Sequence, residues 1–434
     1  VENGSVLNVE NLTGERYALD ASFQVLSAQN GVSGTYTLTG DTYISTFYGL
    51  TADYSNPNAV VLRVSQSRSF DQISGLNKNQ NAVAGALQFL DINNPLYQAI
   101  GYLTDENEAK RAFTQLGGEI HSSGQAVAIE DSRFVREAAF GRLRSSLGGI
   151  GAGEAVKDDG VSWWSHGFGS GGRFENTTNN GASDLDRTIG GGFAGVDAAL
   201  NNSWRIGALA GYSHSNFNTR WLDSSGEAAG YHVGVYGGGK AGMLDVKLGA
   251  AYSWQEIDTS RSISFTGYTD ALSASYRNHV TQVYGEVSHQ FDVMGVVAEP
   301  FANLAYVHLN SGSFTEDGGA AALRADSNNS STVFSTLGLR ASFAVSEDGA
   351  TKFYGSAGWR HAYNDLNPVA TTSFVAGGNA FSTGGVPIAQ DAGVLEFGLD
   401  RKLNDGLSIG VSYSGQFSKG SQDNGAKARL QWKF

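Results

Sequence analysis

Strict alternation of apolar and polar side chains along the C-terminal part of the sequence constrains the fold more than any other feature. In the last nine residues, AKARLQWKF, one face of an extended strand carries Ala426, Ala428, Leu430, Trp432 and Phe434, and the other face carries the residues between them. The segments LSIGVSYSGQF, MLDVKLGAAYSW and VLEFGLD alternate in the same way. Because the pattern persists to the final residue, we expect the last strand to be paired within a sheet.

About twelve such segments follow one another from residue 162 to residue 434. They begin near Ser162, Arg187, Trp204, Glu227, Met243, Ala271, Val296, Ser330, Thr351, Ile388, Leu407 and Gly425. Short joins such as KLNDGL and KAGML are interspersed with longer polar joins such as FVAGGNAFSTGG. An even number of alternating strands, with short turns on one rim and long loops on the other, is typical of outer-membrane barrels. The sequence therefore predicts an all-β transmembrane fold, a 12-stranded antiparallel outer-membrane β-barrel.

The composition agrees with such a chain and excludes several other classes. The 434 residues include no cysteine, so disulfides, thiolate metal sites and cysteine nucleophiles are excluded. A formal net charge of -13 does not favour nucleic-acid binding, which requires a basic surface. No run of about eighteen apolar residues is present, so we expect no transmembrane helix. A soluble β-sandwich is the alternative fold, but it would rarely need so many strands with small or charged inner faces.

Aromatic and glycine residues give two further expectations for the barrel. The tryptophans and the terminal phenylalanine gather near strand ends and suit the two interfacial girdles of such a barrel: Trp163, Trp164, Trp204, Trp254, Trp359, Trp432 and Phe434. Four glycines are expected to face inward and widen the lumen: Gly190, Gly192, Gly207 and Gly211.

The residues before the barrel change in character along the chain. Val1 to about Ser69 is β-like, and the first residues contain no signal peptide, so an exported protein would begin here in a processed or truncated form. From about Asn79 to Ser146 the segments are rich in Ala, Leu, Glu and Arg at helical spacing. The last of these could be some twenty residues long, but its many charges forbid contact with lipid. The helix therefore needs a surrounding layer of polar protein groups, a polar sheath, that separates it from lipid.

A barrel of twelve strands supplies that sheath, because it has room for about one helix. We therefore expect residues from about Gln125 to Ser146 to thread the lumen. Four arginines of this lumen helix are expected to pair with carboxylates of the wall. The arginines are Arg133, Arg136, Arg142 and Arg144, and the candidate wall partners are Asp245, Glu286, Glu396 and Asp400.

Several segments of the sequence also resemble those of a known protein family. The segments NQNAVAGAL and QLGGEIHSSGQAVAIEDSRFVREAAFGRLR, followed by a barrel that opens on WWSHGFGS and closes on LQWKF, resemble the C-terminal part of a monomeric (type Va) autotransporter. The resemblance implies four parts: residues 1–78 as the end of a passenger β-helix with an autochaperone-like segment, residues 79–124 as a helical connecting region, residues 125–161 as the linker helix and Gly-rich bridge, and residues 162–434 as the translocator barrel.

The resemblance also implies a function, a location and partners. The chain would be an outer-membrane translocator domain of a Gram-negative bacterium that secretes and displays its N-terminal passenger at the cell surface by type V secretion. Its partners would be outer-membrane lipid, its own passenger, the barrel assembly machinery and periplasmic chaperones, and it would be a monomer. The C-terminal residues Leu430, Trp432 and Phe434 resemble the barrel assembly signal. Some members cut their passenger at an asparagine of the linker helix, but no Asn lies between Glu119 and Ser146, so that reaction is not expected.

Other chemistry receives little support from the sequence. Three G-x-G-x-x-G matches lack the strand, helix and βαβ context of a nucleotide site. The eight histidines are scattered without metal-ligand spacing, and no serine stands in a full G-x-S-x-G motif. We expect no cofactor, no metal and no enzymatic activity. The alternatives are an outer-membrane pore or barrel enzyme, and an adhesin whose N-terminal β region binds a partner.

Overall fold

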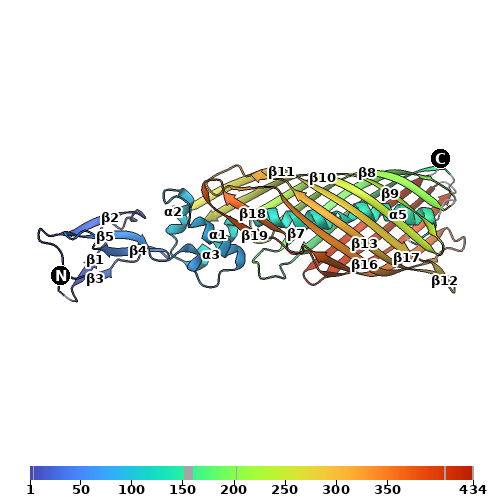
Figure 1. Cartoon of the computed structure of the whole chain (residues 1–434). Helices are drawn as coiled ribbons and strands as arrows, with labels where there is room; N and C mark the ends of the chain where they lie inside the picture. The colour runs from blue at the N-terminus through green and yellow to red at the C-terminus, as the bar shows by residue number, and fades with distance from the viewer. Residues whose placement is uncertain (3, 151–159, 202, 405–406, 433–434) are drawn as a thin grey trace.

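The computed structural model describes the whole chain except residues 3, 151–159, 202, 405–406 and 433–434. Twelve long strands of the described chain form a closed antiparallel barrel (Figure 1). They are β6 (Val161–Phe174), β7 (Leu185–Ala199), β8 (Trp204–Thr219), β9 (Ser224–Ala241), β10 (Leu244–Phe265), β11 (Tyr268–Ser288), β13 (Val296–Ser311), β16 (Asn328–Ala344), β17 (Thr351–Asn364), β20 (Asp391–Asn404), β21 (Leu407–Ser418) and β22 (Ser421–Trp432). Each predicted strand start lies within four residues of an observed one.

The barrel closes through the first and last strands. β22 pairs with β6 from Ser421 opposite Phe174 to Trp432 opposite Trp163, and every other long strand pairs with its neighbours in the chain. A short strand, β12 (Phe291–Val293), extends the turn between β11 and β13. Full closure leaves no sheet edge unpaired, which a sheet in a lipid environment requires.

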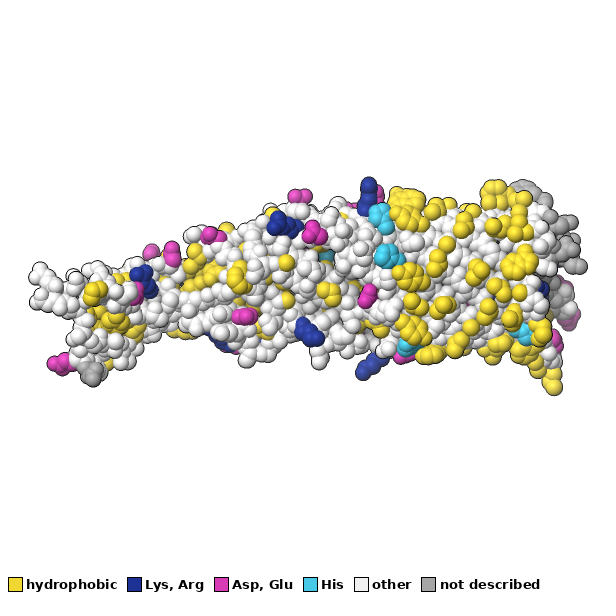
Figure 2. All heavy atoms as spheres, in the orientation of Figure 1, with side chains coloured by type: hydrophobic (Ala, Val, Ile, Leu, Met, Phe, Trp, Pro, Cys, Tyr) yellow, Lys and Arg dark blue, Asp and Glu magenta, His cyan; other side chains and the backbone are white. Residues whose placement is uncertain are grey.

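The alternation in the sequence gives the barrel an apolar outer face and a polar inner face. Exposed apolar side chains such as Val235, Leu248, Leu339 and Val411 lie on the outer face. Figure 2 shows hydrophobic side chains gathered over the part of the barrel farthest from the N-terminal region, with histidines near the boundary. We call this band the apolar belt, the rim beyond it on the N-terminal side the outer rim, and the opposite rim the inner rim.

Aromatic residues line the outer-rim edge of the apolar belt. Tyr212, Tyr231 and Trp254 lie in register on β8, β9 and β10, with ring centroids 5.3 and 5.7 Å apart. Trp359 and, at the inner-rim end of the barrel where β22 ends, Trp163 are about half exposed on the outer face. Trp164 differs from the prediction, because it faces inward, is 6% exposed and donates a hydrogen bond to Tyr236 Oη at 2.6 Å.

Two of the four glycines expected in the lumen face the other way. Gly190 and Gly192 alternate with the buried side chains of Ile189 and Phe193, so they lie on the outer face of β7. Gly207 and Gly211 flank the buried Leu209 on β8 and do face inward. The prediction for β7 was wrong by one residue, and a shift of one residue exchanges the two faces of a strand.

A cap covers the outer rim. It contains a four-stranded sheet of β14 (Phe314–Thr315), β15 (Leu323–Ala325), β18 (Val369–Phe374) and β19 (Gly377–Gly384). The helices α1 (Lys78–Leu87), α2 (Pro95–Gly101) and α3 (Glu106–Leu116) pack beside it, after the single turn η1 (Phe70–Gln72). Side chains Asn77, Asn94 and Asp105 cap the first turns of the three helices by accepting backbone N–H bonds.

The N-terminal region projects from this cap at the end opposite the inner rim (Figure 1). β1 (Val6–Val9) pairs with β3 (Thr37–Gly40) in parallel, whereas β2 (Ser22–Ser27), β5 (Ala59–Gln66) and β4 (Tyr48–Asp53) form an antiparallel sheet. Phe47, Phe70 and Tyr97 pack together and join this sheet to the helices.

Two consecutive helices, α4 (Glu119–Asp131) and α5 (Arg133–Leu147), occupy the barrel lumen. We call them together the lumen helix. It is about 43 Å long at 1.5 Å per residue. Gly118 and Gly148 bound it with φ values of 62° and 76°, a conformation that glycine adopts at little cost. The helix begins before the predicted Gln125. Among the described residues, no helix is long and apolar enough to cross a membrane.

A charged helix in the lumen of the barrel

Three acidic side chains of the lumen helix bind cations of the wall. Glu130 accepts two hydrogen bonds from the Arg360 guanidinium, both of 2.8 Å. Asp131 lies 2.9 Å from Arg187 Nη2, and Glu137 lies 2.9 Å from Lys427 Nζ. Paired guanidinium and carboxylate groups of this kind fix both position and orientation.

Two arginines of the helix bind carboxylates of the wall in return. Arg133 Nη2 lies 2.6 Å from Asp423, which also accepts a 2.7 Å bond from Arg187. Arg142 donates to both oxygens of Asp197, at 2.5 and 2.8 Å. The polarity of the pairs therefore alternates between helix and wall, so a rotation or slide of the helix would bring like charges together.

Asp197 is the most heavily used carboxylate at the inner-rim end of the lumen helix. Besides Arg142 it accepts hydrogen bonds from Arg205 Nε at 2.7 Å and from the Tyr236 hydroxyl at 3.0 Å. Its own exposure is 2%. A carboxylate this deeply buried is compatible with folding because the two cations and the hydroxyl replace its water shell.

The two remaining helix arginines lie in different surroundings. Arg136 donates to Ser132 Oγ at 3.0 Å and to Gln282 Oε1 at 3.4 Å, and no carboxylate of the described residues lies within 4.0 Å of it. Arg144 lines the same cavity and makes no ion pair within that distance among the described residues.

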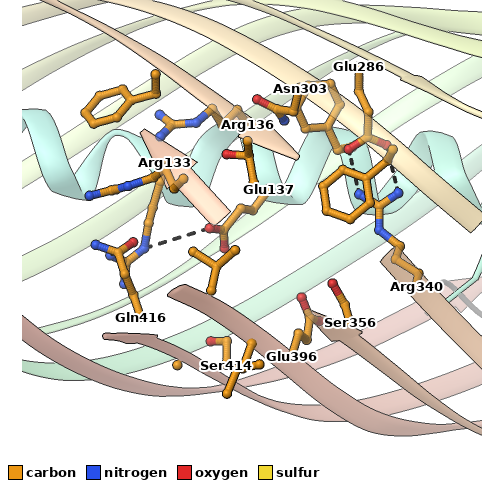
Figure 3. Close-up of a pocket in the computed structure, with 18 of the residues that line it drawn as sticks. Arg133, Arg136, Glu137, Glu286, Asn303, Arg340, Ser356, Glu396, Ser414 and Gln416 are labelled. Atoms are coloured by element: carbon orange, nitrogen blue, oxygen red, sulfur yellow. Dashed lines mark hydrogen bonds and ion pairs between the residues drawn. The ribbon is translucent and has the colours of Figure 1, made fainter. Parts of the chain in front are cut away.

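The four predicted wall carboxylates lie in the lumen but bind cations of the wall itself. Asp245 pairs with Lys240 at 2.7 Å, and Asp400 pairs with Arg429 at 2.9 Å. Glu286 accepts from Arg340 at 2.6 Å and from Lys247 at 3.0 Å, and Glu396 accepts from Lys427 at 3.2 Å. Figure 3 shows Glu286 and Glu396 around the cavity beside the helix.

The sequence pattern did not single out several residues that hold the helix, namely Asp197, Asp423, Arg187 and Arg360 on the wall and Glu130, Asp131 and Glu137 on the helix. The sequence feature that could have identified the wall residues is a charged side chain at an inward-facing position of an alternating strand. Asp197, for example, shares its face of β7 with the buried side chains of Ile189 and Phe193.

Apolar contacts complete the fit of the helix. Phe134 stacks on Phe168 of β6 with ring centroids 4.3 Å apart, and Phe140 meets Tyr284 of β11 edge to face at 5.1 Å. Wall glycines allow close approach: a Cβ on Gly238 would lie 3.3 Å from Leu143 of the helix.

A buried ionic cluster holds the helix at the outer rim. His121 Nε2 lies 2.8 Å from Glu316, which also accepts two 2.7 Å bonds from Arg261. Glu316 lies between β14 and β15, beyond the apolar belt. Burial raises its pKa, but the Arg261 guanidinium and His121 outweigh that effect and lower the pKa of Glu316 to about 2.

The lumen offers no arrangement for hydrolysis or metal binding within the described part of the chain. No three His, Asp or Glu side chains there could hold a metal ion together. The His232 imidazole lies between two serines, with Ser213 Oγ 2.9 Å from Nε2 and Ser253 Oγ 2.7 Å from Nδ1. A carboxylate that could orient a serine and histidine pair therefore occupies neither position.

The C-terminal strand is the seam of the barrel. Leu430 is 44% exposed on the outer face, while Lys427 points into the lumen. Trp432 pairs with Trp163 in the backbone ladder. Phe434 lies outside the described residues, and so does the side chain of Trp432.

A closed barrel with an apolar belt, a charged lumen and a helix of its own chain inside defines an outer-membrane barrel protein with an occupied channel. Comparison with known families gives the same class: the model of the autotransporter β-domain matches residues 163–414, and the chain belongs to that family. The β-domain is a transport element rather than an enzyme.

The individual relatives agree with this assignment. Two proteins of Serratia marcescens, both named extracellular serine protease, are 29% identical over 489 residues, covering 100% of this chain, and 32% identical over 368 residues, covering 82% of it. The chain spans only 46% and 34% of their lengths. The translocator domain of autotransporter NalP from Neisseria meningitidis has the same fold, with a TM-score of 0.57, 18% identity and coverage of 73% of this chain and 99% of that one.

The chain therefore contains the translocator domain of an autotransporter, a barrel of the Gram-negative outer membrane that serves the secretion of its own passenger by the type V route. The expectations for fold, family, function and location are confirmed.

Proposed function

We propose that the lumen helix is the segment that trails a secreted passenger and then stays in the barrel, so that one structure both tethers the passenger and closes the pore. The observation that carries this proposal is the set of ion pairs of both polarities between helix and wall. Glu130 with Arg360 and Arg142 with Asp197 lie at different levels of the lumen and involve buried groups. A helix that only rested in the channel would not need them.

Under this proposal the chain has the four parts expected from the sequence. Residues 1–78 are the C-terminal end of the passenger, residues 79–124 connect it to the barrel, residues 125–161 are the linker, and residues 162–434 are the translocator. The parallel pairing of β1 with β3 supports a β-helix-like end for the passenger, because successive turns of a β-helix pair in parallel.

Single-channel conductance in a planar bilayer tests the plug. The full chain should be nearly silent, and a version that begins at Gly151 should conduct strongly, because it lacks the helix. A version that begins at Gly118 is the matched control, since it loses the N-terminal region and keeps the helix, and it should also be silent. Equal, open conductance from all three would replace the plugged translocator with a diffusion pore. If the version that begins at Gly118 conducted as strongly as the version that begins at Gly151, the N-terminal region and not the helix would be the closure.

The passenger is proposed to carry serine protease activity, because both Serratia relatives bear that name and extend well beyond the length of this chain. A fluorophosphonate probe, which labels activated serines, applied to cells that express the whole protein should label a segment preceding Val1. Labelling of no part of the surface-exposed protein would contradict this and favour a passenger with another role, such as adhesion.

Assembly partners complete the proposal. Leu430, Trp432 and Phe434 are proposed as the signal read by the barrel assembly machinery, with periplasmic chaperones delivering a monomeric chain and outer-membrane lipid surrounding the apolar belt. Deletion of Phe434 should reduce insertion into the outer membrane at unchanged synthesis. Unchanged insertion would remove this residue from the signal.

A further inference from the structure

A cavity of about 140 Å³ lies between α5 and the wall formed by β11, β13, β16, β17, β20, β21 and β22. This is room for roughly ten water molecules, at 10 to 15 Å³ each on the same measure. Figure 3 looks into it and shows Arg133, Arg136 and Glu137 of the helix, with Asn303 on one side of them and Ser356 and Ser414 of the wall on the other. The cavity is lined by charged side chains together with apolar ones such as Phe140, Phe301 and Phe334.

The carboxylates around the cavity already hold cations. Glu286 is bound by Arg340 and Lys247, Glu396 by Lys427, and Glu137 by Lys427, with Arg133 3.8 Å away. Asp423 is bound by Arg133 and Arg187. The cations Arg340, Lys427, Arg133 and Arg360 are thereby matched to carboxylates, with Arg360 on Glu130.

Arg136 and Arg144 are the cations of this cavity that make no ion pair among the described residues, and Arg136 is the one that lies against Phe334 of β16. Its exposure is 6%, its hydrogen bonds go to two neutral oxygens, and no carboxylate of the described residues lies within 4.0 Å. The guanidinium lies over the ring of Phe334 at 5.4 Å, and the Arg360 guanidinium lies over the same ring at 4.8 Å. Two cations are thus held near one another on one aromatic ring, although like charges repel. A buried guanidinium without a counter-ion is costly.

Neutral donors of the wall line the same cavity as this cation. Asn303, Thr336 and Arg360 lie opposite one another in register across β13, β16 and β17. Ser356 and Ser414 line the same cavity, and so does Thr336. Amide N–H and hydroxyl groups beside a guanidinium form the donor set that binds anions.

We propose that this cavity binds a small inorganic anion, a halide or an oxyanion of similar size, between Arg136 and the wall donors Asn303 and Thr336. The anion supplies the negative charge that Arg136 lacks and bridges the lumen helix to β13 and β16, so it acts as a counter-ion that helps retain the helix in the barrel.

Crystallography with bromide tests the position of the anion. Crystals of the full chain grown in bromide should show an anomalous scattering peak within hydrogen-bonding distance of the Arg136 guanidinium. Water at that position, with bromide only on the exposed surface, would overturn the proposal.

Thermal unfolding of the full chain provides a second readout. At constant ionic strength, replacing gluconate, whose polyhydroxy chain makes it much larger than a halide, by chloride should raise the unfolding midpoint in a saturable way. In Arg136→Met the chloride-dependent rise should fall at least threefold, and Arg136→Lys should retain part of it. Arg144→Met is the matched control, because this arginine lines the cavity but lies two helical turns from Arg136, and it should keep the full rise. An equal rise in all variants would mean general salt screening and would overturn the proposal.

Discussion

At the scale of single residues, the lumen depends on a few carboxylates that each bind several partners. Asp197 binds Arg142 of the helix, Arg205 of its neighbouring strand and the Tyr236 hydroxyl, all with almost no solvent contact. The importance of such a carboxylate for stability lies in the buried cations that its removal would leave in place. Without the carboxylate, two buried guanidinium groups would lose the ion pair that they share.

Asp197→Asn should therefore reduce the free energy of unfolding by about 3–5 kcal/mol, the usual cost of breaking a buried pair by removing one partner. Denaturant unfolding of the full chain in detergent, followed by tryptophan fluorescence, measures this. Asp186→Asn is the control: its partners Arg173 and Arg220 lie at 3.0 and 3.1 Å, but all three side chains are at least one-third exposed. That change should cost no more than about 1 kcal/mol. Equal costs would show that the Asp197 cluster contributes no more than a surface pair.

The ionic cluster at the outer rim predicts a pH dependence. The pKa of Glu316 is lowered to about 2, below the value of about 4.3 expected in the unfolded chain. A lowered folded-state pKa stabilises above the unfolded value and loses that contribution as pH falls toward 2. Resistance of the cap to an acid-active protease such as pepsin should therefore decrease from about pH 5 to pH 2.

The variant Glu316→Gln should remove that dependence. Because Arg261 and His121 would lack their carboxylate, the cap of the variant should be cut faster already at pH 5, and the rate should change little on further acidification once the activity of the protease is corrected with an unfolded substrate. A variant as pH-sensitive as the parent chain would place the acid response in another group.

At the scale of secondary structure elements, the loop between β19 and β20 lies directly against the lumen helix. A Cβ on Gly385 would lie 2.4 Å from the Ser123 backbone nitrogen and 2.5 Å from the Ser122 carbonyl carbon. The next residue, Val386, donates its N–H to Ser123 Oγ at 3.1 Å. Because the added Cβ would meet backbone atoms, no flexible side chain could move aside to make room for it.

Gly385→Ala should accordingly cost about 1–3 kcal/mol of stability through overpacking. Gly393→Ala on β20 is the control, since its added Cβ would meet nothing closer than 3.8 Å. The comparison is sharpest in a chain that begins at Gly151, where the helix is missing and the penalty at Gly385 should vanish. A penalty that persists there would mean that the strain lies within the loop itself.

The sequence predicted the elements well and the contacts between them poorly. Alternation placed all twelve strands, because a strand with one face toward lipid and one toward a lumen must alternate. The charges between Arg133 and Arg144 predicted a helix that needs a polar sheath. Which carboxylate met which arginine depends on the stagger between neighbouring strands, and a helix can rotate in the lumen, so no local pattern determines it.

The contacts within the cap likewise could not be predicted from local sequence patterns. Its sheet joins β15, from the connection after β13, to β18 and β19, from the connection after β17. In the sequence these are short β-like segments inside long polar loops. Asn79 of α1 binds Gly384 through two hydrogen bonds, 305 residues away along the chain. Contacts of this range leave no periodic signal.

At the scale of the whole molecule, the apolar belt fixes how the barrel sits in a membrane. On β16, Leu339 lies between Phe343 toward the inner rim and Val333 toward the outer rim, and Val333 pairs with Tyr306 and Tyr363 of the outer aromatic edge. Leu339 is 50% exposed and has Pro300 and Ala357 as its neighbours in register. It therefore lies near the middle of the belt.

Leu339→Arg should destabilise the barrel in lipid vesicles by about 2–4 kcal/mol, the cost of a cation at the middle of the lipid face of such a barrel. Thr269→Arg is the control: Thr269 is exposed on β11 beyond the belt, where an added charge meets water and should change stability by no more than about 0.5 kcal/mol. The two variants are compared by guanidinium unfolding in vesicles. Equal effects at both positions would mean that the middle of the apolar belt is not in contact with hydrocarbon, and the orientation of the barrel in the membrane would then have to be revised.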